Sequence, residues 1–274
     1  MVQKSAWMTT RFAAALLASV CGGLLGYEME RHSVAAAQGT TGGVAPAEVK
    51  PFIAKRREAS YPPGPNAQPK VLVRNLARRS DGSTVERYEA VSPSGEFGEV
   101  IDGSDLRIGK GFVLEPFTRS LTTFYLSDRE IGQRRAAQDA CGESEVRTAL
   151  SAAPRTSEPR PAVLGFDLVR VDYAPPSSRR VEIVRWVAPS LGCLALRETQ
   201  SFPATGGHND LEIVGLNQAE PPDSAFDIPD GYVERSPAEV EAAYSAKYGK
   251  PYYGQPAVAA IDKRYHDHQT YRRN

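Results

Sequence analysis

The residue types that most often carry out chemistry are few in this chain and poorly spaced for catalysis. The four histidines are at positions 32, 208, 266 and 268. His208 follows two glycines in a polar stretch, which is typical of an exposed hairpin loop rather than of a general base. His266 and His268 flank one aspartate in a tail with few other ligands, so they predict at most a weak transition-metal site. The sequence therefore predicts no catalytic residue and no metal centre.

One segment imitates a phosphate-binding loop. Five residues separate Gly103 from Gly109 where that loop has four, and Gly111 follows Lys110 where a Ser or Thr is needed to reach magnesium. The chain contains no Gly-x-Ser-x-Gly elbow, no His-Glu-x-x-His helix and no EF-hand loop. We therefore expect a protein that is not an enzyme and has no cofactor.

The three cysteines, Cys21, Cys141 and Cys193, favour an oxidising compartment. If Cys21 belongs to an export signal, the exported part keeps an even number. A disulfide between Cys141 and Cys193 is then the economical interpretation, worth about 4 kcal/mol by chain entropy for a loop of this length. The alternative is two unrelated buried thiols. The chain has no Cys-x-x-Cys spacing, which disfavours a role in thiol-redox catalysis.

The first 37 residues have the outline of an export signal. Lys4 and Arg11 precede an uncharged apolar run over 12–27, and the alanines at 35–37 offer a cleavage site. This run is shorter than the ~20 residues that span a bilayer comfortably. A cleaved signal peptide is thus the first interpretation, and an uncleaved membrane anchor is the second. Either places the protein in the periplasm or the cell envelope.

Two further segments flank the region predicted to fold. Residues 38–69 contain six prolines and four glycines, which predicts a flexible linker. Residues 249–274 form a basic tail rich in tyrosine. Interleaved Tyr and Lys/Arg side chains can contact an anionic surface, a glycan or a protein partner by stacking and charge. A loosely packed terminus is the alternative for this tail.

Residues 70–248 predict a single α+β domain built on an antiparallel sheet. An Asp-Gly turn within Arg79–Ser83 predicts a hairpin. Short turns at spacings near ten residues favour antiparallel strands over alternating βαβ units. Runs rich in β-branched and aromatic residues predict strands at 71–74, 85–91, 97–101, 106–114, 117–126, 163–173, 181–188, 193–202 and 211–216.

Two helices are predicted beside this sheet. A capping-box pattern that begins at Ser127 predicts a helix as far as Ala140, followed by a glycine at which the helix can end. A second box begins at Ser236, with Pro237 at the first helical position.

The second half of the chain resembles a known family. The segments that carry the resemblance are Val181–Pro189, which contains Trp186, then Leu191–Cys193, then Glu220–Tyr232, which contains Phe226. They are similar to uncharacterised exported bacterial proteins with a LolA/LppX-like lipoprotein-carrier domain, over about residues 163–235. The resemblance implies a strongly curved antiparallel half-barrel with a few covering helices. It also implies an apolar cavity that takes a lipid or an acyl chain.

The same residues have structural interpretations without the family. Trp186, shortly before Pro189, is typical of an apolar anchor at a sheet edge. Phe226 and Tyr232 surround a tight turn and predict a hydrophobic plug. All three are candidate cavity residues, and a cavity filled by the protein's own side chains is the alternative to a ligand-filled one.

The charge balance narrows the class of partner. The chain has 33 Lys+Arg and 33 Asp+Glu, so it lacks the basic surplus of a nucleic-acid-binding protein. Two hypotheses remain. The first is a non-enzymatic cell-envelope protein whose curved sheet binds a lipid or acyl chain. The second is an envelope interaction or regulatory module whose basic tail contacts a protein partner. An uncleaved N-terminus would add membrane contact to either.

Overall fold

The computed structural model describes residues 49–64, 68–137, 140–152, 162–173, 181–252, 265–266 and 269. The predicted export signal at 1–37 and most of the C-terminal tail lie outside these residues. Within the described part of the chain, no helix has both the length and the apolar character needed to cross a membrane.

The described elements are mostly strands joined by short turns. In chain order they are β1 (Phe52–Tyr61), β2 (Lys70–Arg78), β3 (Thr84–Val91), β4 (Phe97–Asp105), β5 (Lys110–Glu115), β6 (Ser120–Tyr125), α2 (Asp128–Ala137), η1 (Ala140–Gly142), α3 (Ser144–Ser151), β7 (Ala162–Val163), β8 (Phe166–Asp167), β9 (Val169–Tyr173), β10 (Glu182–Ala188), η2 (Pro189–Leu191), β11 (Leu194–Phe202), β12 (Gly207–Asn217), η3 (Asp223–Phe226), β13 (Val233–Glu234) and α4 (Pro237–Tyr248).

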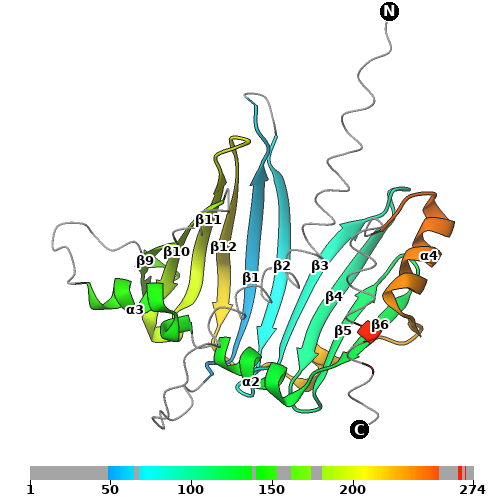
Figure 1. The fold of residues 1–274 in the computed structure, drawn as a ribbon, viewed down its shortest axis with the longest axis horizontal. Coiled ribbons are helices and arrows are strands. Elements are labelled where there is room, and N and C mark those ends of the chain that lie inside the picture. The colour runs from blue at the N-terminus through cyan, green and yellow to red at the C-terminus, as the bar shows by residue number, and fades with distance from the viewer. Residues whose placement is uncertain are drawn as a thin grey trace, which may run out of the picture.

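Eleven strands form one open, strongly curved sheet (Figure 1). Their order is β13-β6-β5-β4-β3-β2-β1-β12-β11-β10-β9, and β7 with β8 forms a separate hairpin. All neighbours in the large sheet are antiparallel except β13, which runs parallel to β6. The predicted α+β class, with a curved antiparallel half-barrel, is confirmed.

The central strand β1 lies where the sequence predicted a flexible linker. It pairs with β2 along one edge and with β12 along the other. Pro51 and Pro62 flank the strand and do not interrupt it, so the prolines of this region bound the strand. The linker predicted over 38–69 is therefore wrong for Phe52–Tyr61, and the fold begins well before Lys70.

Several predicted boundaries also differ from the structure. Residues 106–109 form a turn in which Gly109 has φ 61°, so β5 starts only at Lys110. The strand predicted over 163–173 is divided by a turn in which Leu164 and Gly165 both have positive φ. His208 lies within β12 and not in a loop, because the hairpin turn occupies 203–206.

The locally encoded features agree with the prediction. The Arg79–Ser83 turn joins β2 to β3, and the Asp81 carboxylate accepts a hydrogen bond from the Ser83 amide at 2.7 Å. The capping box at Ser236 is formed, and α4 ends at Gly249 with φ 64°. The first predicted helix ends earlier, at Ala137, and α3 follows without having been predicted.

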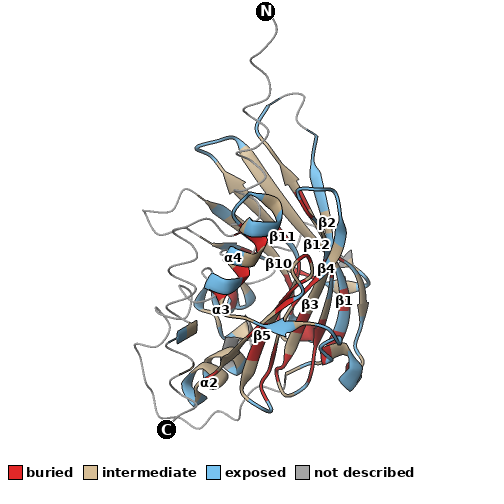
Figure 2. Cartoon of the chain, turned by 90° about the vertical axis from the view of Figure 1, so that its right-hand side faces the viewer, coloured by how far each residue is buried: buried red, intermediate tan, exposed pale blue. Residues whose placement is uncertain are grey.

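The two faces of the sheet differ in what covers them. Helices α2, α3 and α4 lie on one side, and the sheet bends toward that side (Figure 2). We call this side the concave face and the other the convex face. An apolar cluster with Phe226 at its centre covers the convex face of β2 to β5. Its buried members are Ala77, Val85, Ile101, Phe112, Leu114 and Phe226.

Candidate binding groove on the concave face

Four charged residues from three adjacent strands form a closed set of ion pairs, which we call the central quartet. They are Arg56 and Glu58 in β1, Arg74 in β2 and Glu86 in β3. Glu58 is 2.6 Å from Arg56 and 2.8 Å from Arg74, measured between the nearest nitrogen and oxygen atoms. Glu86 is 3.4 Å from Arg56 and 3.2 Å from Arg74. Each glutamate therefore meets both arginines.

The strand register places the central quartet on the concave face. Arg74 lies opposite Arg56 on one side and opposite Tyr88 on the other, and directly opposed residues share a face. Ala90 is two residues from Tyr88 in β3 and therefore points to the same side. Ala90 packs against the aromatic cluster that contains Tyr244 of α4. The quartet thus faces the side that carries the helices.

Burial and charge act in opposite directions on Arg74, whose side chain is only 3% exposed. Burial alone would lower the pKa of its guanidinium, but Glu58 and Glu86 outweigh that effect and the pKa is raised. Its guanidinium also lies 4.3 Å from the centre of the Tyr88 ring. Arg74 therefore stays charged within a set whose net charge is zero.

A second group, the lateral cluster, lies toward the other end of the sheet. Arg185 of β10 forms an ion pair with Glu198 of β11. The Tyr173 hydroxyl of β9 donates a hydrogen bond to Glu143 at 2.5 Å, and Glu143 lies 3.9 Å from Arg185. Gln200 donates to Glu198 at 2.6 Å. Five polar side chains thus interlock across three strands and the start of α3.

The lateral cluster is itself largely shielded from water. Burial, reinforced by Glu143, raises the pKa of Tyr173 to about 12. Burial would lower the pKa of Arg185, but Glu198 and Tyr173 outweigh it, so the pKa is raised. Arg185 therefore remains a cation and Tyr173 a neutral hydroxyl at any physiological pH.

The two groups belong to one surface. Leu211 of β12 lies directly opposite Glu58 on one side and Glu198 on the other, so all three side chains share the concave face. We call the combined set the polar floor. Its six charged members along β10 to β3 are Arg56, Arg74, Arg185, Glu58, Glu86 and Glu198. These strand residues comprise three positive and three negative charges, and Glu143, directly before α3, adds a fourth carboxylate.

The apolar part of the concave face is filled by the protein itself. Phe52, Ala54, Leu196 and Ile213 pack with Leu191 of η2 in one buried cluster. This cluster gives that stretch of the sheet an internal core instead of a lining for a ligand. The described residues of the concave face therefore do not form the wholly apolar cavity that the family resemblance implied.

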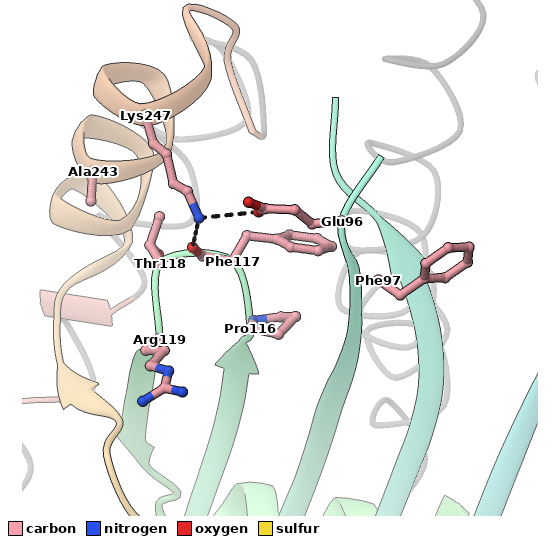
Figure 3. Close-up of a pocket in the computed structure, with 8 residues that line it drawn as sticks. All are labelled: Glu96, Phe97, Pro116, Phe117, Thr118, Arg119, Ala243 and Lys247. Carbon is pink, nitrogen blue, oxygen red and sulfur yellow. Dashed lines mark hydrogen bonds and ion pairs between the residues drawn. The ribbon is translucent and has the colours of Figure 1, made fainter. Parts of the chain in front are cut away.

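A mixed hollow of about 700 Å³ opens beside α4 (Figure 3). Lys247 of α4 reaches across it and donates hydrogen bonds to Glu96 at 3.1 Å and to the Phe117 carbonyl at 2.8 Å. Tyr248 also donates to Glu96, and these contacts lower the pKa of the Glu96 carboxyl. Phe97 points away from them (Figure 3) and is 77% exposed. The hollow is therefore lined by polar and apolar side chains in equal number, and the ion pair of Lys247 with Glu96 lies across it.

None of the site residues predicted from sequence is itself a member of the polar floor. Cys141 and Cys193 are joined in a disulfide. Trp186 is in β10, one strand inside the edge, with the Arg197 guanidinium 5.2 Å from its ring centre. Phe226 is buried on the convex side, and Tyr232 packs against the same cluster.

Sequence reasoning missed the polar floor because its members lie far apart in the chain. The one local signal is the alternation of Arg56 and Glu58 with residues of the other face in β1.

In the part of the chain that the structure describes, no group of three or more His, Cys, Asp or Glu side chains is arranged to hold a metal ion. His208 stacks on Tyr61 with 4.3 Å between ring centres.

Comparison with known proteins adds information on the fold. No family model and no curated protein sequence matches the chain. A crystal structure of MucB is 13% identical, with a TM-score of 0.38, over 68% of this chain and 59% of that one. The chain therefore spans about three fifths of the MucB chain.

The family name that the sequence suggested occurs in the description of one other solved structure, and a second is described as a lipoprotein-sorting domain. A LolA superfamily protein from Nitrosomonas europaea is 10% identical over 66% of this chain and 91% of its own, with a TM-score of 0.32. A putative outer membrane lipoprotein-sorting protein domain from Vibrio parahaemolyticus is 10% identical over 73% and 95%, with a TM-score of 0.31. Both matches cover at least nine tenths of the solved chain and about two thirds to three quarters of this one.

Proposed function

We propose that the chain is a non-enzymatic binding module of the cell envelope and that the space in front of its concave face, which we call the groove, receives a segment of a protein partner. The observation that carries this proposal is the polar floor, where three arginines and three glutamates occupy the middle of the groove. The export-signal pattern and the disulfide between Cys141 and Cys193 support an oxidising compartment such as the periplasm.

Electrostatics favours a polypeptide over an acyl chain as the occupant. Covering these ion pairs with hydrocarbon removes the water that still reaches them and offers no hydrogen bonds in exchange. The gain is only about 0.8 kcal/mol for each methylene that is buried. A polypeptide brings N–H and C=O groups and polar side chains that can hydrogen-bond to the floor. We therefore place the partner contact in the groove rather than in the basic tail.

Site-specific photocrosslinking tests this proposal. Leu72 and Val73 are neighbours in β2 on opposite faces, because Leu72 is opposite Glu58 in β1. A benzoyl-phenylalanine at position 72 should give a discrete protein adduct in intact cells, and the same probe at position 73 should not. Mass spectrometry then identifies the adduct.

Two results would contradict the proposal. One is equal crosslinking from both positions, which would indicate non-specific contact. The other is a lipid that copurifies with the exported protein and is displaced by a fluorescent fatty acid, since that would restore the carrier hypothesis. Substituting Arg74→Met in the position-72 probe protein should weaken a genuine adduct, because it leaves Glu58 and Glu86 with only one of their two shared arginines.

A further inference from the structure

The segment before and within α3 packs on the concave face next to the lateral cluster. Val146 is the buried residue of α3, packed against Val171 of β9 and Val187 of β10. Most other described residues of this helix are exposed. A helix of eight residues is marginal without tertiary support, so its position depends strongly on the contacts that tie it to the sheet.

The disulfide is one of those ties, and its two ends are held very differently. Cys193 is fully buried in the turn between β10 and β11, and its amide donates to the Ala188 carbonyl at 3.0 Å. That end is fixed by the sheet whether or not the disulfide exists. Cys141 is half-buried in η1, directly before α3. Breaking the bond therefore frees the α3 side and leaves the sheet side in place.

Glu143 connects this disulfide to the polar floor. It lies two residues after Cys141. Its carboxylate accepts a hydrogen bond from the Tyr173 hydroxyl at 2.5 Å and lies 3.9 Å from the Arg185 guanidinium. Arg185 keeps Glu198 as a partner when Glu143 leaves. The lateral cluster can thus lose its outer carboxylate without leaving an arginine uncompensated.

We propose that the disulfide between Cys141 and Cys193 is a redox-operated gate on this side of the groove. In the oxidised protein Glu143 and α3 close the lateral cluster, and in the reduced protein they move away and widen the groove. The reductant is a dithiol. One of its thiolates attacks a cysteine sulfur and forms a mixed disulfide, and its second thiol then closes the reductant's own disulfide. The protein gains two electrons and two protons as two thiols.

The gate is tested by reducing the full exported chain and following hydrogen exchange. We expect amide exchange in α3 to accelerate at least tenfold on reduction, while α4 keeps its protection as an internal control. The phenol of Tyr173 gives a second readout, measured as the difference between wild type and Tyr173→Phe in an ultraviolet pH titration. Its pKa should fall from about 12 toward the ordinary value near 10.

Two outcomes would overturn the gate. Unchanged exchange in α3 and unchanged titration of Tyr173, with two new thiols confirmed by mass, would show that α3 does not depend on the bond. Loss of amide protection in α4 as well would show that the disulfide stabilises the whole fold and does not act on α3 alone. The double variant Cys141→Ser/Cys193→Ser should reproduce the reduced protein without reductant. If it fails to fold, reduction of the folded wild type still decides.

The inference rests on the proposed function only where it speaks of a groove for a partner. Hydrogen exchange and the Tyr173 titration need no partner, so they test the gate alone. The crosslink from position 72 is then compared in oxidised and reduced cells. A working gate without any crosslink would remove the proposed partner site and leave the gate. A crosslink that is indifferent to reduction, with α3 unchanged, would remove the gate and leave the partner site.

Discussion

Two arginines five residues apart serve opposite purposes on the two faces of the sheet. Arg74 and Arg79 are both nearly inaccessible, at 2% and 3% exposure. Arg74 pairs with glutamates of its own sheet on the concave face. Arg79 instead stacks on Phe226, 3.8 Å from the ring centre, and donates to Asp223 at 2.5 Å. Both of these partners belong to a distant segment that crosses the convex face.

That segment, residues 220–232, acts as a strap. Arg87 donates to the Ala225 carbonyl at 3.1 Å, and Arg107 lies 3.2 Å from Asp223. The convex face of β2 to β5 is therefore covered by the chain itself. Arg79, Arg87 and Arg107 hold the covering segment in place. The concave face instead carries the helices and the ion pairs of the polar floor. This difference is the reason that the proposed partner site lies on the concave side.

The largest effect is expected from removing the apolar side of the strap. Phe226→Ala should lower the free energy of unfolding by about 3–5 kcal/mol, because it leaves a cavity beneath the strap. Phe97→Ala is the matched control, and at 77% exposure it should change stability by no more than about 0.5 kcal/mol. Urea denaturation measures both. Equal losses would show that the strap is not the structural closure of the convex face.

A smaller effect is expected from the concave arginine. Arg74→Met should cost about 2–3 kcal/mol, because Glu58 and Glu86 lose a buried partner but keep Arg56. Arg170→Met removes an exposed pair with Asp172 and should cost less than about 0.5 kcal/mol. The same urea series checks both variants. A gain in stability from Arg74→Met would contradict this expectation and would show that the central quartet lowers the stability of the fold.

The smallest effect is expected at acid pH from Asp105, whose carboxylate pairs with Arg79 and Arg107, two of the arginines that contact the strap. Hydrogen bonds from Arg107 lower the pKa of Asp105, and Arg79 adds to this effect. The folded pKa is then below the unfolded value, so the stabilisation is complete above about pH 4 and is lost as pH falls through the folded pKa. Asp105→Asn should cost about 1 kcal/mol at pH 7.

The pH dependence separates this effect from simple loss of packing. The stability difference between wild type and Asp105→Asn should shrink steadily below pH 4, as followed by urea denaturation at each pH. Asp230→Asn, at an exposed position, serves as the control and should show no such trend. If this difference in stability stays constant down to pH 2, the negative charge of Asp105 does not contribute to the stability of the fold.

The polar floor explains why β1 was missed from the sequence. A half-buried strand is recognised by apolar residues at every second position. In β1 that pattern starts with Phe52 and Ala54, which belong to the buried apolar cluster. It continues with the charged residues Arg56 and Glu58, because from there on the concave side of the strand carries the polar floor. The prolines and glycines nearby then dominated the composition and predicted a linker.

Features that are encoded locally were predicted well. The Asp-Gly hairpin and the capping box at Ser236 need only residues within a few positions of each other. The lateral cluster joins Glu143, Tyr173, Arg185 and Glu198, whose proximity depends on the register of three strands and on the placement of α3. No short window of sequence contains that information, so the lateral cluster is apparent only in the folded chain.

The position of β1 has a consequence for the order in which the protein can assemble. This early strand must pair with β12, which ends at Asn217, so its second edge stays unsatisfied until nearly the whole domain is available. Pairings over such a sequence distance form slowly because the intervening loop must close first. The two halves of the sheet meet at this seam, so the pairing of β1 with β12 is expected to form last and to join halves that are already paired internally.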